Sequence, residues 1–399
     1  MSELRGLEDL EVSGRRVLVR CDLNVPLEDG DITDDLRIRA SLPTLNALLD
    51  RDGRVAVCSH LGRPKGKPVE ALRLRPVASR LGELLNREVV ILTEVVGENV
   101  AKACSSNAEV VVLENLRFDP GEESNDPAFA ERLASLAEAY VNDAFGSSHR
   151  AHASVVGVAE RLPSAAGVLL QREIDVLGEL LRDPARPFVA VLGGAKVSDK
   201  LGVIENLLER VDTICVGGAM AFTLLAARGE DVGRSRVEQD RLQEVRDVLT
   251  NAEHHGVDIL LPSDVVAAEA PEEGSPHATV PMRDIGARLG VDIGPLSVET
   301  FARTVGEART VLWNGPMGIF EIDDYSNGTK AVAEAIAGAT RKGAFTVVGG
   351  GDSAAALNEL GMMDAASHVS TGGGATLEFL EGKDLPGVAA LRAQERGRR

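Results

Sequence analysis

Short runs of valine, isoleucine and leucine recur along the chain, separated by longer segments in which apolar residues follow helical spacing. Most of the short runs are continuously apolar, which is typical of strands that are covered on both faces of a parallel sheet. Strand followed by helix, repeated many times, predicts an α/β protein with parallel sheets. The predicted strands begin at Arg16, Arg54, Glu88, Glu109, Phe188, Val211, Val257, Thr310 and Phe345. The predicted helices include residues 42–53, 76–87, 126–139, 199–211, 235–256 and 328–343.

A long helical segment near the middle of the chain marks a division between two halves. Residues 171–187 have helical spacing and are closed by Pro184 and Pro187, directly before a new strand. We therefore expect a first domain over residues 1–170, a connecting helix over 171–183 and a second domain from residue 184. Two α/β halves joined by one helix are expected to form a cleft, and ligands favour clefts at domain interfaces.

Composition and charge narrow the class of protein. The 399 residues carry 43 Lys and Arg against 62 Asp and Glu, a formal net charge of −19, which argues against binding to nucleic acid or to an anionic membrane. The N-terminus has no apolar signal-peptide core, and the four cysteines lie far apart without a CxxC pair. We expect no disulfide scaffold and no structural zinc site, and a reducing, cytoplasmic location fits best.

In the first half, polar and basic residues follow directly after the predicted strands, where open parallel sheets bind their ligands. Arginine binds carboxylate or phosphate in bidentate fashion, and such a gathering of positive charge runs against the acidic composition of the chain. The pattern indicates a site for a small anion. The residues at these strand ends are Asp22, Asn24, Arg37, Arg39, His60, Arg63, Lys65, Lys67, Arg117, His149, Arg150 and His152.

Several of the residues near these strand ends also have a simpler interpretation. Arg39 and Lys67 fit solvated surface charges, because Lys and Arg are seldom buried. His152 could equally be a hydrogen-bonded structural histidine. Asp22 and Asn24, between a strand and a proline, could form only an Asx-turn.

In the second half, glycine-rich loops follow the strands instead. They contain the strings LGGAKVSDK, CVGGAMAF, WNGPMGIFE, VVGGGDSAA and STGGGATLE. Backbone amides in such loops, together with a helix N-terminus, can hold phosphate, and Lys196 and Lys200 are four residues apart on one predicted helix face. Glycine needed only for a tight turn is the alternative for any single loop.

One of these loops also satisfies a dinucleotide-binding pattern. Gly349, Gly351 and Ala354 match G-x-G-x-x-A after a strand, which leaves an NAD-dependent oxidoreductase open as an alternative. However, this strand lies near the end of the chain rather than opening a βαβ unit, and no acidic residue about 20 positions later follows a second strand. A Walker-type P-loop is absent from the sequence.

Taken in order, long strings of the chain resemble the signature segments of phosphoglycerate kinase. They are VRCDLNVP, DDLRIRASLPT, SHLGRPKG, LENLRF, NDAFGSSHRAHAS, LGGAKVSDK, WNGPMGIFE, VVGGGDSA and STGGGATLEFLEGKDLPGV. The resemblance implies two Rossmann-like domains with parallel sheets, 3-phosphoglycerate on the first and magnesium nucleotide on the second. It implies reversible transfer of a phosphoryl group between 1,3-bisphosphoglycerate and ADP, giving 3-phosphoglycerate and ATP in glycolysis, by a monomer.

The resemblance also implies roles for particular residues. The triose-binding positions fall among the strand-end residues named above, and they are Asp22, Asn24, Arg37, His60, Arg63, Arg117 and Arg150. Residues 376–399 are expected to pack back on the first domain. Arg37, Lys200 and Gly373, within the run Gly372 to Gly374, match catalytic positions, and Asp352 matches the magnesium ligand. Departures are few: Cys21, Leu23 and Ser353 replace the residues common at these positions. The nucleotide-binding matches are Lys196, Lys200, Asn314, Glu321, Gly349, Gly350, Gly351, Asp352 and Ser353.

The chemistry implied by this resemblance needs no general base. The carboxylate of 3-phosphoglycerate is already ionised at neutral pH and is itself the nucleophile. Two polyanions must be held in line, so closure about the helix over 171–183 is expected to be part of catalysis. The alternatives are the oxidoreductase that uses the Gly349 loop and a non-catalytic anion-binding protein, which would leave the second set of phosphate loops unexplained.

Overall fold

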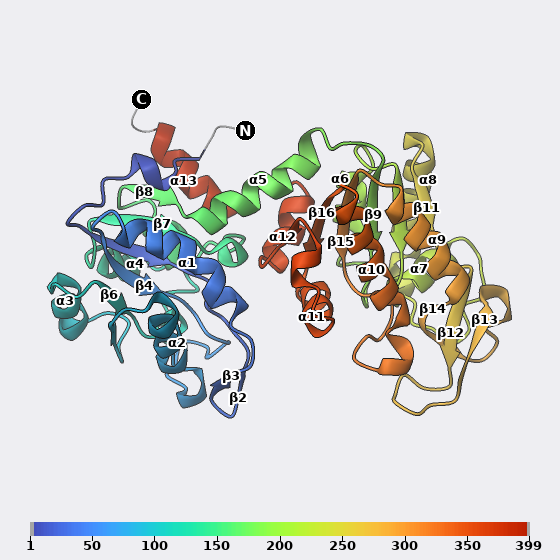
Figure 1. Ribbon diagram of the computed structural model, residues 1–399, viewed down its shortest axis with the longest axis horizontal. Coiled ribbons are helices and arrows are strands. Elements are labelled where there is room, and N and C mark those ends of the chain that lie inside the picture. Colours follow the sequence, from blue (N-terminus) through green and yellow to red (C-terminus); the bar gives the residue numbers. More distant parts are fainter. Residues whose placement is uncertain (1–3, 397–399) are drawn as a thin grey trace. The chain divides into compact units, whose positions relative to one another are not determined.

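The computed structural model describes residues 4–396, and these divide into two compact units (Figure 1). One unit contains the described residues up to Asp175 together with those from Asp384 onward, and the other is Val176–Lys383. None of the helices within residues 4–396 has both the length and the apolar character needed to cross a membrane.

The first unit is built on a six-stranded parallel sheet in the order β5-β6-β4-β1-β7-β8. Strands β1 and β6 are buried along their whole length, as their apolar runs predict. The strands are β1 (Arg16–Arg20), β4 (Arg54–Cys58), β5 (Val89–Ile91), β6 (Val110–Val112), β7 (Ala139–Asn142) and β8 (Ser164–Ala166), with a small hairpin of β2 (Leu27–Glu28) and β3 (Asp31–Ile32). The helices are α1 (Leu36–Leu49), α2 (Arg75–Leu85), α3 (Glu98–Ser105), α4 (Pro127–Ala134) and α13 (Pro386–Arg396). Short helical turns are η1 (Leu7–Asp9), η2 (Glu70–Leu72), η3 (Leu116–Phe118), η4 (Phe145–Ser147) and η5 (Ala153–Gly157).

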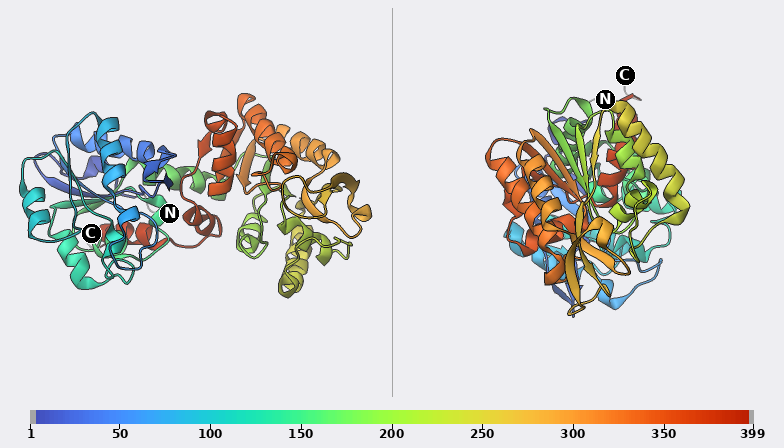
Figure 2. Two further views of the ribbon diagram at one scale, coloured as in Figure 1. Left: turned by 90° about the horizontal axis from the view of Figure 1, so that it is seen from below. Right: turned by 90° about the vertical axis from the view of Figure 1, so that its right-hand side faces the viewer.

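The second unit has a six-stranded parallel sheet of its own, in the order β11-β10-β9-β15-β16-β17. Figure 2 (right) shows its strands between a layer of orange helices and the yellow helix α8. The strands are β9 (Phe188–Leu192), β10 (Thr213–Val216), β11 (Asp258–Leu260), β15 (Thr310–Asn314), β16 (Phe345–Gly349) and β17 (His368–Val369). The helices are α6 (Leu201–Leu207), α7 (Met220–Ala227), α8 (Leu242–His255), α9 (Pro295–Gly306), α10 (Asn327–Arg341), α11 (Gly351–Glu359) and α12 (Gly374–Leu380), with turns η6 (Gln239–Arg241), η7 (Met282–Asp284), η8 (Asp323–Tyr325) and η9 (Met363–Ala365).

These sheets confirm the predicted fold class, two α/β halves with parallel sheets. Every strand predicted from the apolar runs is present. A three-stranded antiparallel sheet in the second unit was not predicted, with β12 (Asp264–Ala268) between β13 (His277–Pro281) and β14 (Leu289–Ile293). Strand β13 is largely exposed, so its sequence lacks the continuous apolar run that indicated the other strands.

The chain passes between the units twice. Helix α5 (Val168–Arg182) contains the division at Asp175, and α13 belongs to the first unit, where it packs on η5 and β8. The sequence placed the start of this return segment at residue 376, whereas the first unit resumes at Asp384. The reason is that α12 packs on α6, where the side-chain amide of Asn206 donates a hydrogen bond of 2.7 Å to the carbonyl of Leu380.

Candidate active site

The residues that follow strands of the first sheet lie at its carboxyl edge. Asp22 and Asn24 come after β1, His60 and Arg63 after β4, and Arg117 lies in η3 after β6. Arg150 follows β7 and η4. Because these strands are parallel neighbours, their carboxyl ends meet at one edge, as the sequence analysis expected.

Ion pairs and hydrogen bonds join several of these side chains. Arg37 Nη1, from the first turn of α1, lies 3.0 Å from Asp22 Oδ2, and His60 Nδ1 lies 3.9 Å from Asp22 Oδ1. The backbone of Gly62 connects two more, because its N–H donates to Asn24 Oδ1 at 2.8 Å and its carbonyl accepts from Arg117 Nη1 at 2.7 Å. Asp22 and Asn24 therefore contact other segments, which a local turn alone does not explain.

The two remaining arginines are more open. Arg150 is half-buried, and its Nε lies 3.1 Å from Nε2 of His149. Arg63 has an exposed side chain. The surface interpretation is confirmed for Arg39, which is exposed and paired with Asp35 at 2.7 Å, and Lys67 is also exposed.

Burial and positive neighbours disfavour the charged forms of His60 and His152 at this edge. Burial, followed by the charges of Arg20 and Arg117, lowers the pKa of His60 well below its usual value. Burial and the same two arginines lower the pKa of His152 to about 4, and its Nδ1 faces Glu122 Oε1 at 3.7 Å. The positive charge of this edge therefore comes from its arginines, which suits a small ligand with more than one negative charge.

A buried network behind this edge was missed by the sequence analysis. Arg20, the last residue of β1, is completely buried and contacts both His60 and Ser154. Ser154 in turn donates a hydrogen bond of 2.6 Å to the buried carboxylate of Glu122. A charged residue within the apolar run that predicts β1 was the available signal, because an arginine is rarely fully buried unless it is paired.

In the second unit, glycine-rich loops surround a cavity of about 310 Å³. They follow β9, β15, β16 and β17, which are neighbours in the sheet. The Lys200 ammonium donates a hydrogen bond to Asn314 Oδ1, and Ser353 Oγ accepts one of 2.6 Å from the backbone of Gly315. The sequence-predicted residues that line this cavity are Lys196, Lys200, Asn314, Gly350, Gly351, Asp352, Ser353 and Gly373.

Lysine and glycine make this cavity suitable for phosphate. Burial lowers the pKa of Lys200 to about 8, and this effect is opposed by the nearby carboxylates of Asp199, Asp352 and Glu381. Gly350 (φ 92°) and Gly373 (φ 54°) have left-handed backbone that side chains seldom adopt, and each directly precedes a helix. Helix N-termini with free N–H groups favour anions, so both the backbone and Lys200 offer donors to phosphate oxygens.

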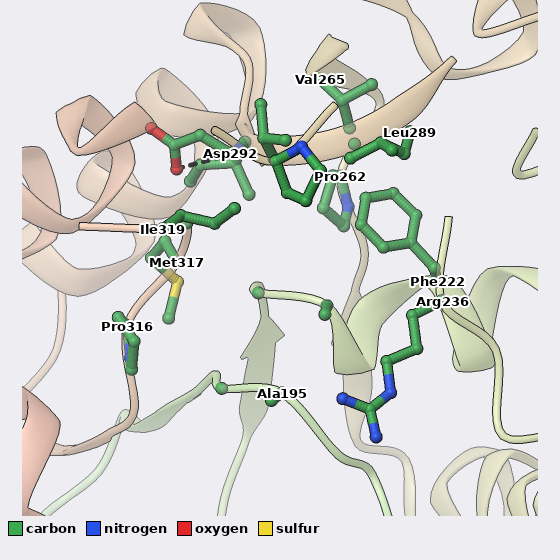
Figure 3. A pocket seen from close by; sticks show the side chains of 18 of the residues that line it. Ala195, Phe222, Arg236, Pro262, Val265, Leu289, Asp292, Pro316, Met317 and Ile319 are labelled. Atoms are coloured by element: carbon green, nitrogen blue, oxygen red, sulfur yellow. Dashed lines mark hydrogen bonds between the residues drawn. The ribbon is translucent and has the colours of Figure 1, made fainter. Parts of the chain in front are cut away.

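A second, mostly apolar cavity of about 470 Å³ adjoins the first and shares Gly194, Ala195 and Asp352 with it. Figure 3 shows Phe222 and Leu289 on one side of this cavity and Ala195 across from them. Glu321 also lines it, whereas Gly349 lies at the end of β16 beside Asn314. A cavity lined by lysine and glycine loops that continues into an apolar cavity suits the two ends of a nucleotide, its phosphates and its base.

The donor set for a metal is small. Within residues 4–396, no group of three or more His, Cys, Asp or Glu side chains is placed to hold a metal ion. Asp352 has an exposed carboxylate in the first turn of α11 and lines both cavities. Magnesium commonly binds through one or two carboxylates together with substrate phosphates and waters, so this donor set fits magnesium that arrives with a nucleotide.

An arginine-rich sheet edge on one α/β unit, and a cavity lined by lysine and glycine loops beside an apolar cavity on the other, fit the class of small-molecule kinases. A family profile described as Phosphoglycerate kinase matches residues 7–383. The chain belongs to the phosphoglycerate kinase family, which confirms the resemblance seen in the sequence.

Individual relatives agree with this assignment. The chain is 56% identical over 393 residues to a phosphoglycerate kinase of Rubrobacter xylanophilus, covering 98% of this chain and 99% of the relative, and 54% identical over 391 residues to one of Thermomicrobium roseum, covering 97% and 99%. Among solved structures, phosphoglycerate kinase from Coxiella burnetii superposes with a TM-score of 0.87 at 39% identity, covering 98% of this chain and 99% of that one. The enzyme is thus a phosphotransferase that transfers a phosphoryl group reversibly between 1,3-bisphosphoglycerate and ADP in glycolysis. The oxidoreductase and non-catalytic alternatives are set aside.

Proposed function

We propose that the two substrates are divided between the two units, with 3-phosphoglycerate at the carboxyl edge of the first sheet and the nucleotide in the adjoining cavities of the second. The observation that supports this most is the pair of anion sites, each at the carboxyl ends of its own parallel sheet. Each site carries a different chemistry, arginines in the first and glycine loops with lysine in the second.

In the first unit, the arginines hold the charged groups of the triose. Partners within the unit already fix the directions of two guanidinium groups: Arg37 pairs with Asp22, whereas Arg117 donates to the Gly62 carbonyl and pairs with Glu123 at 3.2 Å. Each guanidinium still has further N–H donors for a carboxylate or phosphate. The full triose set is Asp22, Asn24, Arg37, His60, Arg63, Arg117 and Arg150.

In the second unit, Lys196, Lys200 and the loops around Gly349 to Ser353 hold the nucleotide phosphates, and Glu321 lies toward the ribose. The residues fit a magnesium ion that is bound chiefly by Asp352 and by the phosphates of the nucleotide. When bound, the ion supplies positive charge that neutralises phosphate oxygens.

Catalysis then consists of placement and charge stabilisation. The carboxylate of 3-phosphoglycerate attacks the γ-phosphorus of ATP, the new O–P bond gives the acyl phosphate, and ADP leaves with the electron pair of the broken bond. Arg37 from the first unit, and Lys200 with the backbone at Gly373 from the second, donate to the oxygens of the transferring group. The ligands of both units must meet in line for this step, so we propose that the units close on each other about α5, which also excludes water.

We further propose that the enzyme acts in the cytoplasm as a monomer. All four cysteines are buried thiols without disulfide partners, which suits a reducing compartment. The net charge of −19 disfavours nucleic acid and anionic membranes as partners.

A coupled assay of ATP-dependent phosphorylation of 3-phosphoglycerate tests this proposal. Turnover should require both substrates and should fall to background when magnesium is chelated and return when it is added back. Full activity without any divalent ion would refute the metal assignment, and NAD(H) binding in a parallel titration would reopen the oxidoreductase alternative.

A further inference from the structure

Arg20 is a buried arginine that lies behind the proposed triose site. Its side chain is 0% exposed, so it cannot reach a ligand at the edge of the sheet. Its guanidinium is engaged on every side: Nε donates to Ser154 Oγ at 2.9 Å, Nη1 donates to the carbonyl of Cys21, and Nη2 lies 3.1 Å from His60 Nδ1 and 3.3 Å from Ser147 Oγ.

We propose that Arg20 is a positioning residue that holds His60 as the neutral tautomer with its proton on Nε2, so that His60 offers an uncharged N–H donor to the triose anion. This inference rests on the proposed function, because it takes His60 to be part of the triose site.

The argument starts from what a guanidinium can do. Arginine carries five N–H donors and no acceptor, and it stays protonated in proteins. The ring atom that faces it, Nδ1 of His60, must therefore accept with its lone pair, and in a neutral imidazole the proton then resides on Nε2. The Asp22 carboxylate does not reverse this choice, because its Oδ1 is 3.9 Å from Nδ1, beyond hydrogen-bond distance.

The groups around His60 also oppose a positively charged ring. Arg20 faces it from β1, Arg37 from α1 and Arg117 from η3, and His152 faces it from the segment before η5. The Asp22 carboxylate, in the loop after β1, lies 3.9 Å from the ring and is already paired with Arg37 at 3.0 Å. A second proton on Nδ1 would lose the Arg20 contact and add a charge beside three arginines.

A second set of contacts keeps Arg20 itself in place. Ser154 Oγ accepts from Arg20 Nε and donates to Glu122 Oε1 at 2.6 Å, and the Ser154 backbone N–H donates to Glu122 Oε2 at 3.0 Å. The hydroxyl has one proton, so this chain of bonds has a single direction, from Arg20 through Ser154 to Glu122. The buried guanidinium and the buried carboxylate are thus joined through the Ser154 hydroxyl, which gives each of them a hydrogen-bond partner.

The chemical consequence concerns the ligand. A donor fixed on Nε2 and kept neutral binds an anion equally well across the range in which a free histidine titrates. The triose site then depends on its arginines for charge and on His60 for a directed hydrogen bond.

The direct test is NMR of the full-length protein with 15N-labelled histidine rings. The signal of His60, among the seven histidines, is assigned by its loss in His60→Gln. We expect a protonated Nε2 and an unprotonated Nδ1 that do not change between about pH 5.5 and about pH 8, on either side of the ordinary histidine pKa. A ring with its proton on Nδ1, or an imidazolium near neutral pH, would overturn the proposal without any need for a variant at Arg20.

A pair of variants tests the role of Arg20. Arg20→Lys keeps the charge but loses the planar fork, and we expect a mixture of His60 tautomers and a KM for 3-phosphoglycerate raised about 10-fold, with a smaller change in kcat, as for the loss of one directed hydrogen bond to a charged ligand. The matched control is Arg16→Lys on the same strand, since Arg16 is also buried but contacts the carbonyls of Cys104 and Ala108 instead. An unchanged His60 spectrum in folded Arg20→Lys would contradict the inference.

Addition of 3-phosphoglycerate to the labelled protein separates this inference from the proposed function. The Nε2 proton signal should shift as the ligand binds. A ring that keeps its proton on Nε2 but does not respond to 3-phosphoglycerate would remove His60 from the triose site and so overturn its role as a donor, which is a different result from a wrong tautomer.

Discussion

Arg37 Nη1 lies 3.0 Å from Asp22 Oδ2, an ion pair that joins the first turn of α1 to the loop after β1. The carboxylate is nearly buried, with 9% of its side chain exposed, whereas the arginine keeps 31%. Asp22 therefore holds one side of the guanidinium while the remaining N–H groups stay accessible. Such an arrangement orients a charge donor before the ligand arrives, which reduces the reorganisation needed during the reaction.

The first prediction concerns Arg37 itself. Arg37→Ala should leave the thermal stability nearly unchanged and lower kcat by at least about 10²-fold, the scale of losing one transition-state charge donor. The matched control is Arg39→Ala, two residues along α1, where the side chain is 53% exposed and pairs with Asp35. Steady-state rates of the two variants decide the matter. Near-normal turnover of Arg37→Ala would rule out the proposed role.

Lys200 makes nucleotide binding depend on pH. Burial lowers the pKa of its ammonium to about 8 in the free protein, so the charge is present below about pH 8 and is lost as the pH rises through that value. Because phosphate binds the charged form, the dissociation constant for ADP should be close to its minimum near about pH 7 and should increase as the pH rises through about 8. Calorimetric titrations measure this. The Lys200→Arg variant keeps a positive charge at this pH, so its affinity for ADP should no longer depend on pH in this range. The same pH profile in the variant and in the natural protein would show that another group is responsible.

Asp352 is predicted to connect the metal with the nucleotide. Extensively dialysed protein should contain no stoichiometric magnesium or zinc, because the described residues offer no cluster of three ligands. Asp352→Ala should weaken ADP binding in the presence of magnesium by about 10-fold or more, the loss of a charged contact, and leave the affinity for 3-phosphoglycerate unchanged. Asp199→Ala, which alters another acidic residue of the same cavity, serves as the comparison. A metal retained by the nucleotide-free protein would contradict this account.

Asp143, a buried carboxylate that accepts a hydrogen bond from the first turn of α5, should make the stability of the protein depend on pH. Asp143 Oδ1 accepts from Thr44 Oγ1 at 2.6 Å and from the backbone of Leu169 at 3.0 Å, while Oδ2 has no hydrogen-bond partner among the described residues. Burial raises the pKa of Asp143 to about 7. The folded state therefore holds a proton that the unfolded state has released, and the stabilisation is lost as the pH rises from about 4 to about 7.

Asp143→Asn tests this directly. The amide cannot ionise, so the variant does not lose stability in this way. The difference in free energy of unfolding between the variant and the natural protein should therefore shift in favour of the variant by about 3 kcal/mol from about pH 5 to about pH 8. The exposed Asp240→Asn should show no such gain. Urea titrations at the two pH values provide the comparison, and a constant difference between Asp143→Asn and the natural protein would refute the shifted pKa.

The sequence was sufficient for nine of the parallel strands because each contains a short apolar run. It did not predict β7, β8 and β17, because β8 and β17 are only three and two residues long with small or polar side chains, and the segment before β7 has the pattern of a helix. The helix start at Asp126 was also predicted correctly, and the Asp126 side chain accepts from the Phe129 backbone at 2.7 Å. The helix expected from Leu42 instead begins at Leu36, with Pro43 inside it. Proline usually ends or kinks a helix, so the sequence favoured a later start.

The sequence could not predict which charged side chains are buried inside the folded units. Arg20, Glu122 and Asp143 come from segments far apart in the chain, and their burial depends on partners that only the folded units bring together. The strand-end arginines, by contrast, were identified because the carboxyl edge of a parallel sheet follows from strand order alone. Which of them contact each other, as Arg37 and Asp22 do, had to come from the structure.

The division of the two substrates between the two units is tested most directly by hydrogen–deuterium exchange of the full-length protein, measured with each ligand alone. We predict that 3-phosphoglycerate slows exchange in the loops after β1, β4 and β7 and leaves the glycine loops after β9 and β16 unchanged, and that ADP with magnesium gives the reverse. Protection of the glycine loops by 3-phosphoglycerate, or of the arginine-bearing loops by ADP, would contradict the assignment.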